Sequence, residues 1–569
     1  MYENHPKCFL YLVRSRFLFF SLALLLIPFS AAAAREAVKI ATVHFGPKLG
    51  DVAGNRARLI ALTEEAARNG AKIIVHTEMA TTGYAFFSRS EIAKVAERID
   101  GPTASSLGKV ARRYGVYVVV GLPTTVPSTG QFFNSAILIG PDGKVAGVYN
   151  KRSTLLEASY NAVAAGPIPT FQTPYGRVAL VICADLFYPQ IPRLAAVNGA
   201  EILLVPANVG VDLSFLKVRA FENDFAVVVA NRYGTEGRGA KQESFSQETF
   251  AIPSPFPYDF NSGSRSAIIS SDGRVMTDFI EAKDAISYAQ LPRKEEHAFP
   301  VVRRPDLYAL MGNDTLEPYT LTQFGLPNPI EFAAAAVDPG VEHRDLAGTT
   351  TAIEAAITAA LNKGWTLRLL VLPAGLFETA DDQSVQELSK IVDARGVDLV
   401  VPFRRENASQ TTPLSLLIAA KSGQSHEIYR YYRTHRMRNE RATLSDRYFI
   451  IDRDYGRIAV LHGPDLAAPE TSVVMAKMGV DVLAVSADSA DDIMMPLWRS
   501  RIGDYLHIVL ANGRGPEAIY LGGYQDDPSQ QEAEGLALML LNVAHVRNKK
   551  EPRNLDVTPL LRKCGAANC

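Results

Sequence analysis

The sequence predicts an α/β protein in which one layered fold occurs twice along a chain of 569 residues. Two observations support this prediction. From Val38 onward, short β-branched runs such as residues 38–45 alternate with amphipathic helical stretches such as residues 56–70, which is typical of sheets covered by helices. In addition, several segments of the first half return in the second half, as expected when a fold is repeated.

The repeat is visible in three segments. GRVALVICADL returns as GRIAVLHGPDL, GAEILLVPAN returns as GVDVLAVSAD, and VVVANRYG at Asn231 returns as IVLANGRG at Asn512. The copies are about 281 residues apart at these points, whereas Glu78 aligns with Ala374 at a larger separation, so the second copy is about fifteen residues shorter beyond that point. We therefore expect two copies of one fold.

Within the first copy, the pattern predicts elements in a regular order. The expected strands are residues 71–78, 116–124, 135–140, 144–151, 177–185 and 201–208. Residues 105–115 and 191–199 read as helices ended by glycine. Pro141-Asp142-Gly143 and Ser271-Asp272-Gly273 have the residue types of tight hairpin turns.

These patterns divide the chain into five parts. We expect a signal segment over residues 1–34, a first domain over 35–310, a linker over 311–332, a second domain over 333–545 and a C-terminal tail over 546–569. The linker is placed where turn-forming residues occur without sustained periodicity.

Charge and composition narrow the class of protein. With 47% hydrophobic and 21% charged residues, the chain is globular, and its net charge of −1 supplies no basic field for a nucleic-acid backbone. We therefore expect no nucleic-acid partner.

The first 34 residues have the features of an export signal. Basic residues precede an apolar run from Phe17 to Phe29, and small residues follow up to Ala34. We expect cleavage near Ala34 and a protein that is periplasmic or secreted, with an uncleaved membrane anchor as the alternative. No later apolar stretch is long enough to span a bilayer.

The chain has four cysteines, which is few for an exported protein. Cys8 would leave with the signal, and Cys564 and Cys569 could pair near the C-terminus. Cys183 then remains as a single thiol, which is either buried and inert or reactive.

Three residues of complementary chemistry stand at the ends of expected strands in the first copy: Glu78, Lys151 and Cys183. A thiol needs a nearby base to become a nucleophile at neutral pH, and a carboxylate can be that base. A lysine favours negative charge on the thiol and on a developing oxyanion. Taken singly, each residue is more often a core or surface residue.

The surroundings of these residues resemble the nitrilase (carbon–nitrogen hydrolase) superfamily. The motifs, in chain order, are HTEMATTGY at Glu78, YNKRSTLLE at Lys151, VICADLFYP at Cys183 and RAFEN at residues 219–223. The resemblance covers residues 37 to about 310. It implies an α-β-β-α sandwich in which Glu78 is the general base, Lys151 stabilises the oxyanion and Cys183 is the acylated nucleophile.

The resemblance also bears on Glu157 and on the substrate. Glu157 resembles a family glutamate that positions substrate, with a surface carboxylate as the alternative. Cys183-Ala184-Asp185 resembles amidase-like branches more than nitrile-hydrolysing ones, although Ala184 and Gln190 depart from that pattern. We therefore expect hydrolysis of a small-molecule amide through a thioester, without metal or cofactor. Acyl transfer to an amine, nitrile hydrolysis and a non-enzymatic binding role are the alternatives.

Other residues near these motifs have open roles. Asp185 could cap the segment after the nucleophile, and we do not count it as catalytic. Arg219 and Glu222 are three residues apart on an expected helix and can pair. The stretch at residues 250–260 could line a pocket or cover the core.

The second copy lacks the chemistry of the first. Ala374, Arg433 and Gly463 stand at the positions of Glu78, Lys151 and Cys183. His435 and His462 lie close to the lost positions, but their spacing is weak support for a metal site. Since the family pairs subunits through the helices of the sandwich, we expect the second copy to pair with the first as an intramolecular pseudo-dimer, with further oligomerisation left open.

Overall fold

The computed structural model describes residues 37–154, 156–162, 164–236, 258–261, 263–292, 298–312, 326–377, 382–407, 410–522, 531–547, 549 and 555–562. The expected signal segment lies outside the described residues, as do Cys8, Cys564, Cys569 and residues 313–325 of the expected linker. From Ala37 onward the chain forms one compact unit. No helix in the described part is long and apolar enough to cross a membrane.

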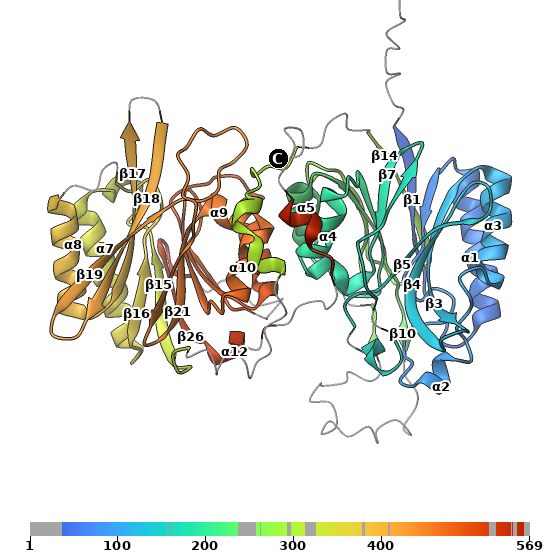
Figure 1. Ribbon diagram of the computed structural model, residues 1–569, viewed down its shortest axis with the longest axis horizontal. Helices are drawn as coiled ribbons and strands as arrows, with labels where there is room; N and C mark the ends of the chain where they lie inside the picture. The colour runs from blue at the N-terminus through green and yellow to red at the C-terminus, as the bar shows by residue number, and fades with distance from the viewer. Residues whose placement is uncertain are drawn as a thin grey trace, which may run out of the picture. The chain divides into compact units, whose positions relative to one another are not determined.

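The first sheet of copy one is mixed. Its strands, in pairing order, are β14 (Ala285–Leu291), β1 (Val38–His44), β2 (Ile73–Val75), β3 (Tyr117–Val126), β4 (Gln131–Ile139) and β5 (Val145–Asn150). β1, β2 and β3 run parallel, whereas β4 and β5 continue the sheet antiparallel. Helices α1 (Val52–Arg68) and α3 (Pro102–Tyr114) cover its outer face (Figure 1). Their buried apolar side chains, such as Leu59 and Leu107, pack on this sheet.

The second sheet of copy one lies on the other side of the sandwich core. Its strands, in pairing order, are β13 (Val275–Phe279), β12 (Ser266–Ile269), β9 (Ala226–Ala230), β8 (Ile202–Pro206), β7 (Gly176–Leu180) and β6 (Thr170–Thr173). β7, β8 and β9 run parallel, so that their carboxyl ends meet at one edge. Helices α4 (Gln190–Val197) and α5 (Leu213–Asn223) follow β7 and β8. The short elements α2 (Arg89–Ile92), β10 (Thr235–Glu236) and β11 (Tyr258–Asp259) lie in the connections.

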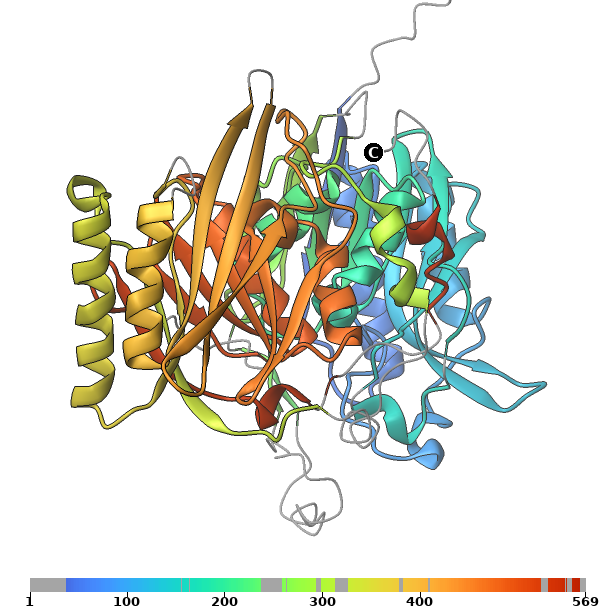
Figure 2. The same cartoon turned by 60° about the vertical axis from the view of Figure 1, so that its left-hand side comes forward.

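Copy two repeats this order. Its first sheet contains β19 (Ser425–Tyr432), β18 (Gln410–Lys421), β17 (Asp398–Asn407), β16 (Leu367–Val371), β15 (Glu331–Val337), β26 (Leu536–Asn542) and β25 (Gln531–Ala533). Helices α7 (Leu346–Asn362) and α8 (Asp382–Arg395) stand next to this sheet in Figure 2.

The second sheet of copy two resembles that of copy one but has five described strands instead of six. Its strands are β20 (Phe449–Arg453), β21 (Gly456–His462), β22 (Val482–Ala487), β23 (His507–Asn512) and β24 (Ala518–Tyr520). The helices of this half are α9 (Gly463–Ala467), α10 (Pro469–Lys477) and α11 (Met494–Arg499), and the short helices α12 (Ala544–Arg547) and α13 (Thr558–Leu561) come near the C-terminus. The expected tandem of α-β-β-α sandwiches is thus confirmed.

Both expected hairpin turns are also confirmed. Gly143 and Gly273 adopt positive φ angles of 76° and 82°, which glycine reaches without steric cost, and they lie between the antiparallel pairs β4–β5 and β12–β13. In copy two, two residues of the hairpin between β18 and β19 adopt positive φ angles, Gly423 at 83° and Gln424 at 54°.

Helices of the two copies pack against each other. α4 contacts α10 and α5 contacts α11, so each helix meets its counterpart. One continuous apolar cluster contains Leu203 of copy one together with Met475 and Leu483 of copy two. Buried ion pairs cross the same contact: Arg501 Nη2 lies 2.7 Å from Glu222 Oε2, and Arg303 Nε lies 3.0 Å from Glu470 Oε1. The two copies therefore share a core and buried charges.

Candidate active site

The structure brings Glu78, Lys151, Glu157 and Cys183 together. Glu78 follows β2, Lys151 directly follows β5 and Cys183 follows β7, so the site is built where strands of both sheets end. All four side chains are buried. Burial of four polar or ionisable groups is costly unless they are paired, which marks this cluster as a candidate for chemistry.

The ammonium group of Lys151 lies between two carboxylates. Lys151 Nζ donates to Glu78 Oε1 at 2.9 Å and to Glu157 Oε1 at 2.5 Å. Asn134 Nδ2 donates to the same two oxygens, at 2.6 Å and 3.0 Å. Glu157 is therefore part of the buried cluster, and its alternative interpretation as a surface carboxylate is wrong.

Cys183 sits in a strained turn. Its φ angle is +52°, a conformation that residues other than glycine rarely adopt, and it starts a 3-10 turn over Cys183–Phe187. Its Sγ lies 3.3 Å from Asn208 Oδ1, on the loop that follows β8. Met79, next to Glu78, has a similar φ of +49°. One strained backbone position, Met79, thus directly follows the candidate base, and the other is the candidate nucleophile itself.

The electrostatics separate the two carboxyl groups. Burial raises the pKa of Glu78 although Lys151 opposes the rise, whereas at Glu157 the ammonium of Lys151 outweighs burial and lowers the pKa. Burial alone would lower the pKa of Lys151, but Glu157 and Glu78 raise it well above its usual range. Glu157 and Lys151 hence stay charged, and Glu78 is the carboxyl group able to exchange a proton.

The thiol is protonated at rest. Burial and the nearby carboxylate of Glu78 raise the pKa of Cys183 well above its usual value, and the opposing effect of Lys151 is smaller. The thiol can therefore become a nucleophile only if a neighbouring base removes its proton as it attacks. Glu78 interacts with this thiol and is placed to do so.

Asp185 has a structural role in the lysine loop. Its carboxylate accepts hydrogen bonds from Tyr149 Oη at 2.7 Å and from the backbone N–H of Ser153 at 2.6 Å. In copy two, Asp465 accepts from Tyr431 Oη at 2.7 Å and from the backbone N–H of His435 at 2.8 Å. Because both copies keep this network, it belongs to the fold.

The predicted Arg219–Glu222 pair is confirmed, and both side chains are fully buried. Arg219 also donates from Nε to the backbone oxygen of Leu186 at 2.9 Å, and so holds the end of the nucleophile turn. Since Glu222 also binds Arg501 of copy two, the pair connects this turn to the other copy. The sequence reasoning did not foresee this second partner.

In copy two, Trp498 fills the space beside Gly463, which stands at the position of Cys183. A Cβ atom placed on Gly463 would lie 2.8 Å from Trp498 Cζ2, and Trp498 Nε1 donates to the backbone oxygen of Gly463 at 2.9 Å. Arg433 pairs with Glu440 at 3.0 Å. Among the described residues, no group of three or more His, Cys, Asp or Glu side chains could hold a metal ion.

His435 and His462 are part of the core of copy two. His435 Nε2 lies 2.9 Å from Tyr308 Oη, and His462 Nε2 lies 3.2 Å from Ser415 Oγ. Burial lowers the pKa of His462 to about 4, which fits an uncharged ring with a structural role.

Further residues near the site had no assigned role in the sequence reasoning. They are Tyr84, Asn134, Tyr160, Asn208, Arg232 and Glu236. Asn134 and Asn208 contact the four-residue cluster directly. Of the stretch at residues 250–260, residues 250–257 lie outside the described part, and Phe260 is buried beside Tyr84.

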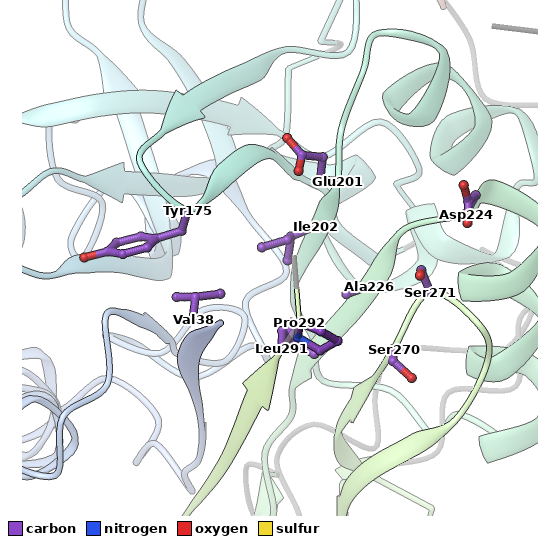
Figure 3. A pocket seen from close by; sticks show the side chains of 10 residues that line it. All are labelled: Val38, Tyr175, Glu201, Ile202, Asp224, Ala226, Ser270, Ser271, Leu291 and Pro292. Carbon is purple, nitrogen blue, oxygen red and sulfur yellow. The ribbon is translucent and has the colours of Figure 1, made fainter. Parts of the chain in front are cut away.

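A separate pocket lies at the other end of the strands. Figure 3 shows it between Val38, Ile202, Ala226 and Leu291. Ile202 and Ala226 begin β8 and β9, whereas Cys183 and Asn208 follow the carboxyl ends of β7 and β8. This pocket is therefore distinct from the candidate active site.

Comparisons with known proteins show the family of this chain. Residues 39–300 match the family described as carbon-nitrogen hydrolase. A nitrilase of Pyrococcus abyssi is 33% identical over 209 residues, covering 36% of this chain and 78% of that protein. A probable nitrilase of Schizosaccharomyces pombe is 29% identical over 285 residues, covering 47% of this chain and 96% of that protein.

Solved structures are similar as well. An amidase from Nesterenkonia is 21% identical, with a TM-score of 0.36, and the match covers 45% of this chain and 91% of that one. The family match and the relatives of similar sequence identify the class of this protein. The chain belongs to the carbon–nitrogen hydrolase (nitrilase) family and is a hydrolase of carbon–nitrogen bonds other than peptide bonds.

Proposed function

We propose that the first copy hydrolyses a carboxylic amide through a thioester on Cys183. The observation that carries this proposal is the buried cluster in which Lys151 joins Glu78 and Glu157 beside a thiol in a strained turn. In this proposal, Glu78 is the general base, Lys151 stabilises the oxyanion, Cys183 is the nucleophile and Glu157 positions Lys151 and the substrate.

The reaction has two halves. Glu78 takes the thiol proton as Sγ attacks the amide carbon, and the negative charge that develops on the oxygen faces the ammonium of Lys151. The intermediate collapses, the carbon–nitrogen bond breaks, and Glu78 returns the proton to the leaving ammonia or amine. Glu78 then takes a proton from water, which attacks the thioester and releases the acid, and the thiol regains its proton.

Intact-mass spectrometry tests the acyl-enzyme. The protein is exposed to a set of primary amides, and we expect a mass increase equal to the acyl group that maps to Cys183 and disappears in Cys183→Ala. An adduct on another residue, or turnover without an adduct in rapid-quench samples, would contradict the thioester. Hydroxylamine should trap the thioester as a hydroxamic acid, whereas dilute alkylamines should not divert the product to a new amide; efficient diversion by the alkylamines would favour acyl transfer.

We also propose that copy two is a catalytically inactive partner within an intramolecular pseudo-dimer. Support comes from the contacts of α4 with α10 and α5 with α11, the shared apolar core and the ion pairs that cross it. Residues 35–310 made alone should expose this surface and aggregate or form a homodimer in light scattering. A stable, fully active monomer would contradict the pseudo-dimer.

For export, we propose that the mature protein begins near Arg35 and acts in the periplasm or outside the cell. The basic start, apolar run and alanine segment of residues 1–34 support this proposal. N-terminal sequencing of protein recovered from its native compartment tests it. An intact Met1 in membrane fractions would favour an anchor.

A further inference from the structure

An aromatic cluster lies against the candidate catalytic residues. It is formed by Met79, Tyr84, Phe86, Tyr160 and Phe260, all of them buried. Met79 directly follows Glu78, and the Nζ atom of Lys151 lies 5.6 Å from the centre of the Tyr84 ring. The cluster is therefore next to the reacting groups and separate from the core between the sheets and helices.

Copy two shows that the sandwich folds without this cluster. The segment after Ala374 is about fifteen residues shorter than the one after Glu78. In the described part of copy two, Leu376 and Phe377 of this segment join the apolar cluster of the first sheet, where Phe377 stacks on Phe403. In copy one, the described residues form a separate cluster beside the candidate catalytic residues, and we relate that cluster to chemistry.

The hydroxyl group of Tyr160 is the polar feature of this cluster. Tyr160 is 2% exposed, and its Oη has no hydrogen-bond partner among the residues that the structure describes. Its backbone N–H donates to the backbone oxygen of Glu157 at 3.0 Å, which fixes it relative to the candidate active site. An unsatisfied buried hydroxyl costs roughly 1–3 kcal/mol, so its retention calls for a partner that is present during function.

Tyr160 acts as a hydrogen-bond donor. Burial and the nearby Glu157 raise its pKa well above the usual value, so the phenol stays protonated at neutral pH. A backbone N–H or an ammonium group on a ligand would leave this donor unpaired, whereas an ether, carbonyl or hydroxyl oxygen would accept its proton.

The charges around the cluster disfavour an anionic ligand. The candidate catalytic residues already place two carboxyl groups, Glu78 and Glu157, beside a single ammonium group. The nearby guanidinium of Arg232 lies 2.5 Å from Glu236, which also accepts from the backbone N–H of Tyr84. A second carboxylate on the substrate would have to lose its hydration here without a free cation among these residues.

We propose that Tyr160 binds the acyl part of the substrate and that the substrate is an uncharged amide whose apolar acyl chain carries a hydrogen-bond acceptor. This inference rests on the proposed amide hydrolysis and specifies its substrate class. In it, Tyr160 is a substrate-binding residue that donates to the acceptor, and the aromatic cluster encloses the rest of the acyl chain. The hydrolysis of amides with an anionic tail is excluded by the same charges.

Binding to the full mature chain carrying Cys183→Ala tests the inference without turnover. The probes are 3-methoxypropanamide, its isostere pentanamide, which lacks the ether oxygen, and the anionic succinamate. By calorimetry we expect the ether amide to bind about 10-fold more tightly than pentanamide, as one added hydrogen bond allows, and succinamate to bind more weakly than both.

Tyr160→Phe in the same background should remove the advantage of the ether amide and leave the affinity for pentanamide unchanged. Tyr117→Phe is the control, because Tyr117 starts β3 and meets Tyr175 edge to face, away from the cluster. The inference is overturned if Tyr160→Phe leaves the ratio intact, if succinamate binds as tightly as the ether amide, or if neither neutral amide binds.

Failure of the proposed function would look different. Wild-type protein that binds the ether amide through Tyr160 but gives no acyl adduct on Cys183 would refute the thioester and uphold the binding site. An acyl adduct on Cys183 from amides that bind equally well to the wild type and to Tyr160→Phe would uphold the thioester and refute the binding site at Tyr160.

Discussion

The turn at Cys183 and the turn at Gly463 are equivalent segments of the two copies, one with the proposed nucleophile and one with glycine at that position. Each follows a parallel strand of a second sheet, and in each a buried aspartate, Asp185 or Asp465, binds a tyrosine hydroxyl and the loop after the neighbouring hairpin. At Cys183 the backbone adopts a positive φ, whereas Gly463, which could do so at no cost, does not. The strained backbone conformation thus occurs only in the turn that carries the thiol, so the fold itself does not require it.

The neighbouring acid loop gives a second comparison. Met79 follows Glu78 with a positive φ, and Gly375 follows Ala374 with a φ of 81°. Here the backbone shape is kept in copy two although the carboxylate is lost. What the copies share, therefore, reports on folding, and what only copy one has reports on chemistry.

The largest expected effect is on amide turnover, and it tests the difference in chemistry between the two copies. Cys183→Ala should lower amide turnover by at least about 10³-fold with little change in stability, because the nucleophile is lost. Adding Gly463→Cys should restore nothing, because Trp498 fills the space that the new side chain needs. Turnover in the double variant, followed by ammonia release, would show that copy two still has a working site.

The next effect concerns the contact between the copies. Glu222→Ala should destabilise the chain by about 3–5 kcal/mol, because Arg219 and Arg501 would both lose a buried partner. The matched control is Glu354→Ala, whose partner Arg395 is half exposed, and it should cost less than about 1 kcal/mol. Denaturant unfolding measures both, and equal costs would mean that the crossing ion pairs do not hold the copies together.

The shared aspartates separate folding from catalysis. Asp185→Asn and Asp465→Asn should each cost roughly 1–3 kcal/mol, because an amide NH₂ group cannot accept from the backbone N–H groups that these carboxylates bind. Asp185→Asn should also lower the turnover rate, since it loosens the loop after Lys151. Asp465→Asn should leave the turnover rate unchanged; a loss there would mean that copy two acts on the site.

The smallest effect is common to both copies. Burial lowers the pKa of His44 in copy one and of His462 in copy two from 6.5 to about 4. Each histidine therefore stabilises the fold above its unfolded pKa, and this contribution is lost as the pH falls from about 6.5 toward 4. Between pH 7 and 6 the loss is about 0.7 kcal/mol for each histidine.

Replacement by asparagine measures this contribution. His44→Asn and His462→Asn should flatten the dependence of the unfolding free energy on pH by similar amounts, as seen in denaturant titrations at the two pH values. An unchanged slope in either variant would place the pH dependence elsewhere.

Much of the fold could be predicted from the sequence because its signals are local. Alternating β-branched runs and amphipathic stretches mark strands and helices, and a constant separation of matching segments marks the repeat. The hairpins at Gly143 and Gly273 were predictable because tight turns require particular residue types. Glu78, Lys151 and Cys183 were found as polar residues at strand ends, and the family motifs added Glu157.

Other features depend on residues that are far apart in the sequence. Asn208 contacts the thiol from the loop after β8, and Glu222 pairs with Arg501, which is almost half the length of the chain away in the sequence. Trp498 fills the space beside Gly463, the residue of copy two that stands at the position of Cys183. No local pattern announces such contacts, because each depends on how separate elements pack.

The sequence by itself thus determined the class of fold and its repetition, since these follow from periodicity, and it supplied the candidate residues for the chemistry through residue type and family motifs. The tertiary structure decided which carboxyl group stays charged, which thiol is strained and which hydroxyl lacks a partner. These properties come from burial and from the distances between charges, and both exist only once the two sheets have closed on each other.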